Sequence, residues 1–120
     1  MIKMVTLIPR KRGMSREEFI DYYENHHVPL ALALFPQIKK CVRNYPSTGN
    51  FHYVGSVASP TVPIDAVTEH WFADQASYDE MMTKFASDPE KFRRLSEDED
   101  KFCDKERMIM FMVEERHTDS

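Results

Sequence analysis

Glycine and cysteine are scarce in this sequence, and their scarcity removes several kinds of functional site. Only three glycines and two cysteines occur among 120 residues. So few glycines leave no glycine-rich loop that could hold a phosphate, and we do not expect nucleotide binding. Cys41 and Cys103 lie far apart without close-spaced partners, so they form neither a metal signature nor a disulfide framework. Two free thiols are typical of a reducing compartment, which indicates a cytoplasmic protein.

Positive charge and long apolar runs are missing as well. The formal net charge is -4, whereas a nucleic-acid-binding protein needs a basic face. No apolar run approaches the ~20 residues of a membrane-spanning helix, and the N-terminus shows no pattern of an export signal. We therefore expect neither a nucleic acid nor a membrane among the partners.

What the sequence does contain is the composition of a soluble globular domain. Hydrophobic residues make up 42% of the chain and charged residues 30%, which is ordinary for such proteins. The length corresponds to about one domain, so we expect a single domain over residues 1–120. Residues 114–120 are expected to form a frayed tail.

Polar residues mark the expected helix starts. Ser15 and Glu18 match a capping box, in which each side chain bonds the backbone N–H of the other residue. Asp74 and Asp88 precede two further helical segments, the second of which has proline at its first position. Pro29 is expected to break or kink the first helix, with a further turn behind it.

Short apolar runs indicate the strands and, with them, the fold class. Strands are expected at residues 2–8, 38–45, 64–72 and 107–113, with a less regular extended piece at residues 51–57. Residues 97–106 are strongly charged, so we expect them to lie in solvent. The order of strand, helix, strand, strand, helix and strand indicates an α+β fold, the ferredoxin-like β-α-β-β-α-β sandwich.

Both faces of the expected sheet carry apolar side chains. Methionine and aromatic residues occur at both parities of the strands, but the helices of this fold cover only one face. A partner subunit that packs sheet against sheet is the simplest cover for the other face. We therefore expect a homodimer that forms a dimeric α/β barrel.

Two motifs in this order resemble the EthD family. Residues 19–30 read Phe-Ile-Asp-Tyr-Tyr-Glu-Asn-His-His-Val-Pro-Leu and look like its first-helix motif, and residues 64–72 resemble its third strand with an acidic residue and a Trp-Phe pair. The resemblance covers nearly the whole chain. It implies a ferredoxin-like monomer, a homodimer and a pocket between sheet and helices. Relatives include enzymes that work without cofactors, such as methylmuconolactone isomerase and fungal polyketide decarboxylases.

Histidines are the leading catalytic candidates, because histidine can give or take a proton near neutral pH. The resemblance implies that His27 is the pocket histidine, and that His70, beside Glu69, stands where the isomerase has a thiol. His26 and His27 point about 100° apart on a helix, so one is structural or exposed, and the motif favours His27 as the inner one. His52 lies in an extended piece from which it could swing over a pocket mouth.

Each candidate also has an ordinary structural explanation. His70 equally suits a sheet or dimer interface. Glu69 would pair with a nearby cation such as Arg43, or would act as an acid or base if it lay in an apolar pocket. Tyrosines either hold a carbonyl or enolate oxygen or simply pack with the hydroxyl at the edge. The candidates for substrate binding are Tyr23, Tyr45, His52, Trp71 and Cys41.

Two hypotheses of function follow. The first is an enzyme without cofactor or metal that transfers protons on a small aromatic, lactone or polyketide-like compound, as an isomerase, lyase or cyclase of a degradation or secondary-metabolite pathway. In it, His27 is the main acid or base and His70 or Glu69 its partner. The second is a non-catalytic dimeric barrel that binds a small molecule or a haem.

Overall fold

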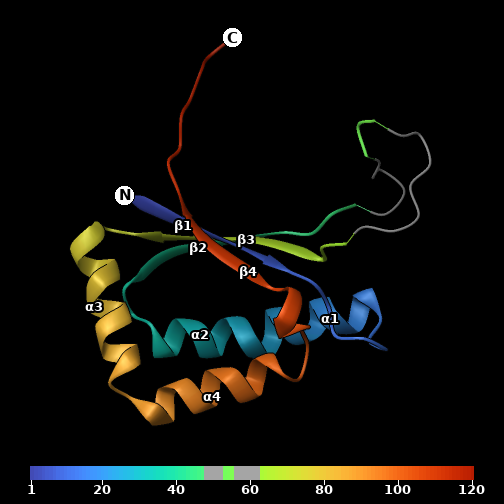
Figure 1. Ribbon diagram of the computed structural model, residues 1–120, viewed down its shortest axis with the longest axis horizontal. Helices are drawn as coiled ribbons and strands as arrows, with labels where there is room; N and C mark the ends of the chain where they lie inside the picture. The colour runs from blue at the N-terminus through green and yellow to red at the C-terminus, as the bar shows by residue number, and fades with distance from the viewer. Residues whose placement is uncertain (48–52, 56–62) are drawn as a thin grey trace.

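One antiparallel sheet carries the fold of the computed structural model, which describes residues 1–47, 53–55 and 63–120 (Figure 1). Its strands are β1 (Ile2–Ile8), β2 (Ile38–Asn44), β3 (Ala66–Phe72) and β4 (Ile109–Val113). Within the described residues they form a four-stranded sheet in the order β2-β3-β1-β4. Every neighbouring pair is antiparallel. The predicted ferredoxin-like fold is confirmed.

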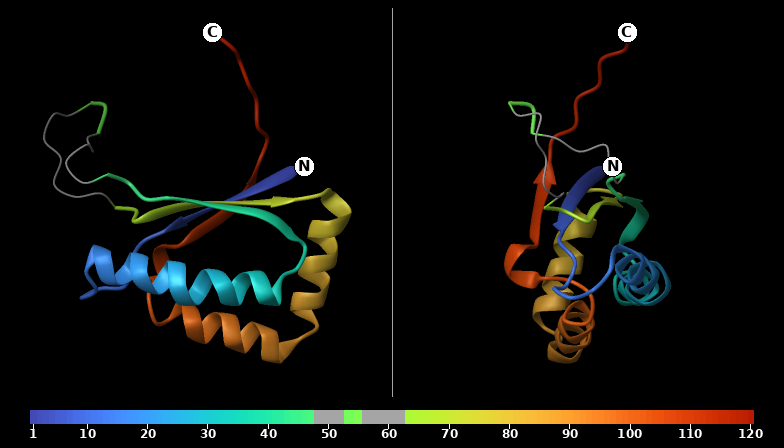
Figure 2. Two further views of the ribbon diagram at one scale, coloured as in Figure 1. Left: turned by 180° about the vertical axis from the view of Figure 1, so that it is seen from behind. Right: turned by 90° about the vertical axis from the view of Figure 1, so that its right-hand side faces the viewer.

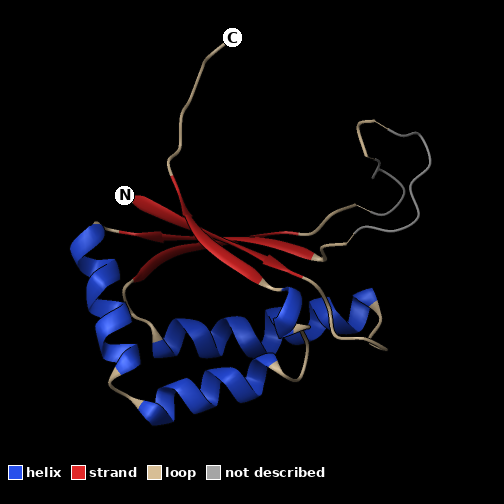
Figure 3. Cartoon of the chain, viewed as in Figure 1, coloured by secondary structure: helices blue, strands red, loops and turns tan. Residues whose placement is uncertain are grey.

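The helices lie together on one side of this sheet (Figure 3). They are α1 (Arg16–Tyr22), the π-helical turn η1 (Tyr23–His27), α2 (Val28–Leu34), α3 (Gln75–Ala86), α4 (Pro89–Glu99) and the 3-10 turn η2 (Lys105–Arg107). Figure 1 shows α1, η1 and α2 as one continuous rod, with α4 running beside it and α3 linking the end of β3 to α4. None of the described helices has the length and apolarity needed to cross a bilayer.

All three predicted helix starts are confirmed. The Ser15 hydroxyl accepts a hydrogen bond from the Glu18 N–H at 3.1 Å, and the Glu18 carboxylate accepts one from the Ser15 N–H at 3.1 Å. The carboxylates of Asp74 and Asp88 likewise accept bonds from backbone N–H groups of α3 and α4. These caps satisfy N–H groups that have no partner inside a helix.

Pro29 does not end the first helix: it lies in the first turn of α2, directly after the π-helical turn η1. The preceding π turn changes the helix phase. Phe19, Tyr23 and His27 recur every four residues and are all buried, although residues four apart drift by about 40° around a regular α-helix. The wider turn removes part of that drift and keeps these side chains facing the sheet.

The segment after α4 corrects one expectation. Phe102 and Cys103 are buried, so residues 97–106 do not simply lie in solvent. Backbone hydrogen bonds tie this segment to the loop after β1, from Lys11 N–H to the Phe102 carbonyl at 2.9 Å and from Asp104 N–H to the Pro9 carbonyl at 3.0 Å. This pairing draws the end of α4 into the protein.

Two expected extended segments are also revised. Residues 105–107 form the turn η2, so the last strand begins at Ile109 rather than at residue 107. Of the extended piece expected at residues 51–57, the structure describes residues 53–55, and Val54 and Gly55 lie in a turn. The other residues of that piece, His52 among them, lie outside the described residues.

The second face of the sheet carries none of the described helices (Figure 2). By the strand register, Lys3, Val5 and Leu7 of β1 share this outer face with Ile109 and Phe111 of β4. Ile109 is 53% exposed and Phe111 is 41% exposed. The homodimer that would cover this face stays a prediction.

Candidate active site

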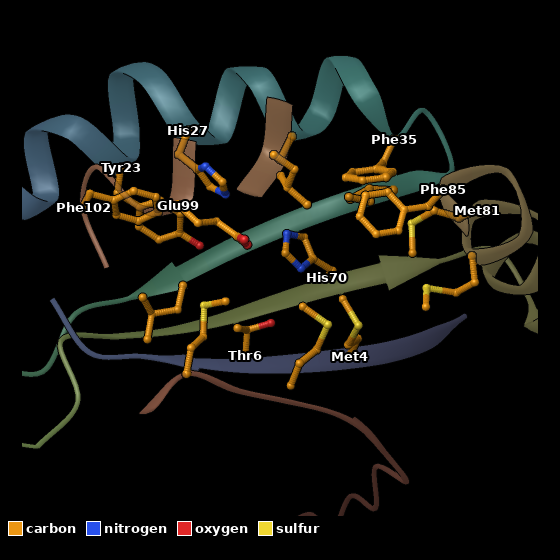
Figure 4. A pocket seen from close by; sticks show the side chains of 17 residues that line it. Met4, Thr6, Tyr23, His27, Phe35, His70, Met81, Phe85, Glu99 and Phe102 are labelled. Atoms are coloured by element: carbon orange, nitrogen blue, oxygen red, sulfur yellow. The ribbon is translucent and has the colours of Figure 1, made fainter. Parts of the chain in front are cut away.

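A cavity of about 150 Å³ lies between the sheet and the helices (Figure 4). Its walls come from β1, β3, the helical rod, α3 and α4, and most lining side chains are methionine, aliphatic or phenylalanine. An apolar cavity of ~150 Å³ is large enough to hold a benzene-sized molecule. The polar groups on its wall are few and belong to Thr6, Tyr23, His27, His70 and Glu99.

His27 enters the cavity from the last position of η1. The imidazole packs against Phe102, with ring centroids 4.7 Å apart, and is 8% exposed. Its Nδ1 atom lies 2.8 Å from the Oδ2 atom of Asp98. Burial lowers the pKa of His27 below its usual 6.5, and the Asp98 carboxylate opposes that shift. The ring is therefore mostly neutral at pH 7, which suits a base.

Glu99 reaches the cavity from the last position of α4. Figure 4 shows its carboxyl group pointing into the space where the rings of His27 and His70 also lie. Burial raises the pKa of Glu99 to about 7, against the lowering effect of Lys105 and with the help of the neighbouring Asp100. A carboxyl group of this kind can hold a proton at neutral pH and release it.

His70 faces the same cavity from the middle of β3. Its Nδ1 atom is buried and has no hydrogen-bond partner among the described residues. Since a buried N–H without an acceptor is rare, we expect the proton of the neutral ring on Nε2. Burial lowers the pKa of His70 to about 4, and the positive charges of protonated His27 and of Arg43 act in the same direction. The ring is thus a neutral hydrogen-bonding group.

The comparison with known proteins agrees with this fold. The sequence matches the EthD domain over residues 11–106. This chain belongs to the EthD family. No curated protein matches it. The resemblance that the two sequence motifs indicated is confirmed.

Several solved structures have a similar fold at low sequence identity. An EthD family protein from Bacillus halodurans is 19% identical, with a TM-score of 0.62 over 97% of this chain and 99% of that one. The Arabidopsis thaliana protein At3g17210 is 14% identical, with a TM-score of 0.62 over the whole of both chains. A dimeric protein of unknown function with a ferredoxin-like fold from Bacteroides fragilis is 10% identical, with a TM-score of 0.56 over 94% of each chain.

In this EthD protein, two of the expected site residues lie away from the cavity. Glu69 and Trp71 alternate with His70 along β3, so they point to the outer face of the sheet. Glu69 Oε2 lies 3.2 Å from Lys3 Nζ, and the Trp71 ring lies between the ammonium groups of Lys3 and Lys40, at 5.0 and 4.8 Å from its centroid. The structure does not bring these residues together with His27.

Glu69 does pair with a cation, as its structural explanation expects, but the cation is Lys3 rather than Arg43. The Arg43 guanidinium instead donates two hydrogen bonds to Glu24 of η1, at 2.7 and 2.9 Å. Arg43 lies on the helix side of β2, because successive strand residues point to opposite faces. The hydroxyl of Tyr45 also donates to Glu24, so Tyr45 belongs to this charged cluster rather than to the cavity wall.

The remaining expected residues lie close to the cavity. Tyr23 lines it, and its hydroxyl is 2.6 Å from the hydroxyl of Thr68. Cys41 lines a second pocket of about 30 Å³, which shares Tyr23, His27 and His70 with the main cavity. Of the two adjacent histidines, His27 is buried and His26 is exposed.

The sequence analysis missed Asp98 and Glu99. Both belong to a run of acidic residues that resembles a solvated surface. One local feature could have indicated that this segment is partly buried. Phe102 follows Asp98 by four residues and Glu99 by three, so it would lie on the same side of a helix as they do.

The side chains and the size of the cavity were compared with the needs of a metal ion and of a haem. No group of three or more His, Cys, Asp or Glu side chains in the described parts of the chain could hold a metal ion. A cavity of about 150 Å³, the size that holds benzene, has no room for a porphyrin.

Proposed function

We propose that this EthD protein is an enzyme that moves protons on a small neutral carbonyl compound, as in an isomerisation or a related lyase reaction. The observation that carries the proposal is that His27, Glu99 and His70 all line one apolar cavity. Titratable groups with shifted pKa values in a cleft are typical of catalytic sites. No cofactor is needed for such chemistry, because side chains alone can supply the acid and the base.

The protonation state of each group determines its role in the proposed reaction. His27 takes a proton from the carbon next to the carbonyl, so that the C–H bond breaks and the electron pair moves to the carbonyl oxygen. The protonated carboxyl group of Glu99 and the N–H of His70 donate hydrogen bonds to that oxygen as it becomes negative. In a substrate with a C=C bond next to the deprotonated carbon, the negative charge extends to the far carbon of that bond. Return of the proton from His27 to that carbon shifts the double bond, reforms the carbonyl group and completes an isomerisation.

The cavity also limits the substrate class. Its volume suits one ring, which favours a small aromatic compound or lactone over a polyketide of several rings. The described lining includes no lysine or arginine, and a carboxylate buried without a cation is strongly disfavoured. A neutral molecule with one carbonyl group fits these walls best.

Hydrogen–deuterium exchange next to a carbonyl tests this proposal without knowledge of the natural substrate. Cyclohexanone, a neutral one-ring ketone, is incubated with the protein in D₂O and followed by proton NMR. We expect exchange above the buffer rate, and His27→Gln should lower the protein-dependent rate by ~10²–10⁴-fold, the usual contribution of a general base.

The control is Glu69→Gln, which changes a carboxylate on the outer face of the sheet and should leave the rate unchanged. Circular dichroism checks that each variant keeps its fold. Absence of exchange above the buffer rate with the wild-type protein, or an unchanged rate in His27→Gln, would overturn the proposal.

We also infer that the protein is a homodimer. Support comes from the apolar outer face of the sheet, where Ile109 and Phe111 are exposed. The similar protein from Bacteroides fragilis is described as dimeric. A second copy packed on this face would remove these side chains from water.

A further inference from the structure

The side chain of Asp98 contacts the ring of His27, the proposed base, but is not part of the cavity lining. Its Oδ2 atom lies 2.8 Å from His27 Nδ1, and its Oδ1 atom accepts a hydrogen bond of 2.5 Å from the Tyr22 hydroxyl. The His27 and Asp98 side chains are only 10% and 12% exposed. Both carboxylate oxygens of Asp98 are therefore engaged with the helical rod.

We propose that Asp98 is a positioning residue that keeps the proton of neutral His27 on Nδ1, so that the Nε2 lone pair serves the cavity. An ionised carboxylate can only accept hydrogen bonds, so His27 must donate from Nδ1. The neutral ring carries one N–H, which leaves Nε2 as the acceptor. This inference rests on the proposed function, in which His27 is the base.

Other groups around His27 do not explain its tautomer. Glu99 of α4, His70 of β3 and Tyr23 of η1 share the cavity with it. In the described residues, however, Asp98 is the hydrogen-bond partner of the His27 ring, and none of these three bonds it. The arrangement follows the logic of an acid–histidine pair, in which the carboxylate fixes the orientation of the imidazole.

Tyr22 makes a sharp test possible. Burial, together with the hydrogen bond to Asp98, raises the pKa of Tyr22 to about 12, so its hydroxyl stays protonated. In an Asp98→Asn variant, this hydroxyl donates to the amide oxygen, which turns the amide NH₂ toward His27 Nδ1. An NH₂ group can only donate, so the proton of His27 should move to Nε2.

Long-range proton–nitrogen NMR of the ¹⁵N-labelled full chain reads the tautomer directly. The signals of His27 are identified by their loss in His27→Gln. We expect the Nδ1–H tautomer in the wild-type protein and the Nε2–H tautomer in Asp98→Asn. In the double variant Tyr22→Phe/Asp98→Asn the amide is free to rotate, and both tautomers should appear.

The matched control is Asp100→Asn, the same change two residues further along the chain. Asp100 is 61% exposed and pairs with Lys105, so the His27 tautomer should not change. Asp98→Asn should also lower the pKa of His27 further, because the carboxylate that opposes the effect of burial is gone. A merely structural role of Asp98 would leave the tautomer of a folded Asp98→Asn variant unchanged.

The outcomes separate this inference from the proposed function. An Nε2–H tautomer in the wild-type protein, or an unchanged tautomer in Asp98→Asn, overturns the role of Asp98 whatever the exchange assay shows. The expected tautomers without any exchange of cyclohexanone overturn the proposed function, while the role of Asp98 in fixing the tautomer stands. If Asp98→Asn does not fold, the wild-type protein and the Tyr22→Phe variant are measured instead. Both keep the Asp98 carboxylate, so both should show the Nδ1–H tautomer of His27, and an Nε2–H tautomer in either would overturn the role of Asp98.

Discussion

Asp98 and Glu99 are neighbours in the sequence with the same functional group, yet their surroundings give them different properties. The Asp98 carboxylate accepts one hydrogen bond from the Tyr22 hydroxyl through Oδ1 and contacts His27 Nδ1 through Oδ2. The Glu99 carboxyl group faces apolar walls, and burial raises its pKa to about 7. One residue is suited to hold a base in place and the other to donate a proton, because solvation and hydrogen bonding set the behaviour of a carboxyl group.

At this residue scale we predict a bell-shaped pH dependence of the exchange reaction. His27 must be neutral, so the rate rises through its pKa, which burial holds below 6.5. Glu99 must be protonated, so the rate falls above about pH 7. Glu99→Gln should lower the maximum and remove the alkaline fall. Rates of cyclohexanone exchange measured between about pH 5 and 9 check this, and an alkaline fall that persists in Glu99→Gln would contradict it.

At the scale of elements, β3 separates neighbouring residues that the sequence places together. Glu69 and Trp71 point outward and His70 points into the cavity, because strand side chains alternate between faces. The local strand pattern predicts this alternation, but the position of the helices determines which set of side chains faces the cavity.

We predict that ligand binding distinguishes the two faces of β3. His70→Phe keeps a ring of similar shape but removes its hydrogen bond to the ligand, which is worth ~0.5–1.5 kcal/mol. The Kd of cyclohexanone should therefore rise by about 2–12-fold. Glu69→Gln, one residue away, should leave the Kd unchanged. A titration followed by NMR measures the Kd of cyclohexanone for both variants. If the two substitutions change the Kd equally, the ligand does not bind on the face of β3 that carries His70.

At the scale of the whole molecule, the helices cover one face of the sheet and leave the other without a helix (Figure 2). The side chains on that open face are apolar and charged. Lys3 of β1 bridges Glu69 and Glu115 there, so the segment after β4 is tied to this face. Exposed apolar side chains on a continuous sheet face are typical of a protein interface.

We predict that this face forms the homodimer. Phe111→Glu places a charge in the expected interface and should raise the dissociation constant of the dimer by ~10-fold or more. Phe92 of α4 is 56% exposed and lies in the helix layer, so Phe92→Glu should leave the dimer intact. Sedimentation velocity over a range of concentrations measures both variants. A monomeric wild-type protein, or the same behaviour in both variants, would rule out this interface.

Short stretches of the sequence account for the local features of this protein. The capping box at Ser15, the caps at Asp74 and Asp88 and the order of strands and helices were all predictable, because each depends on residues only a few positions apart. The helix motif with His27 pointed to the right family for a similar reason, since it is continuous in the chain.

Contacts between residues far apart in the chain depend on how the elements pack. Asp98 lies 71 positions from the histidine that it contacts, and nothing in the charged run around it distinguishes it from a surface residue. The backbone pairing of residues 102–104 with the loop after β1 draws the end of α4 inward and buries Glu99 beside His27 and His70. Proximity of such distant residues and the desolvation that shifts their pKa values arise from packing, which no local pattern records.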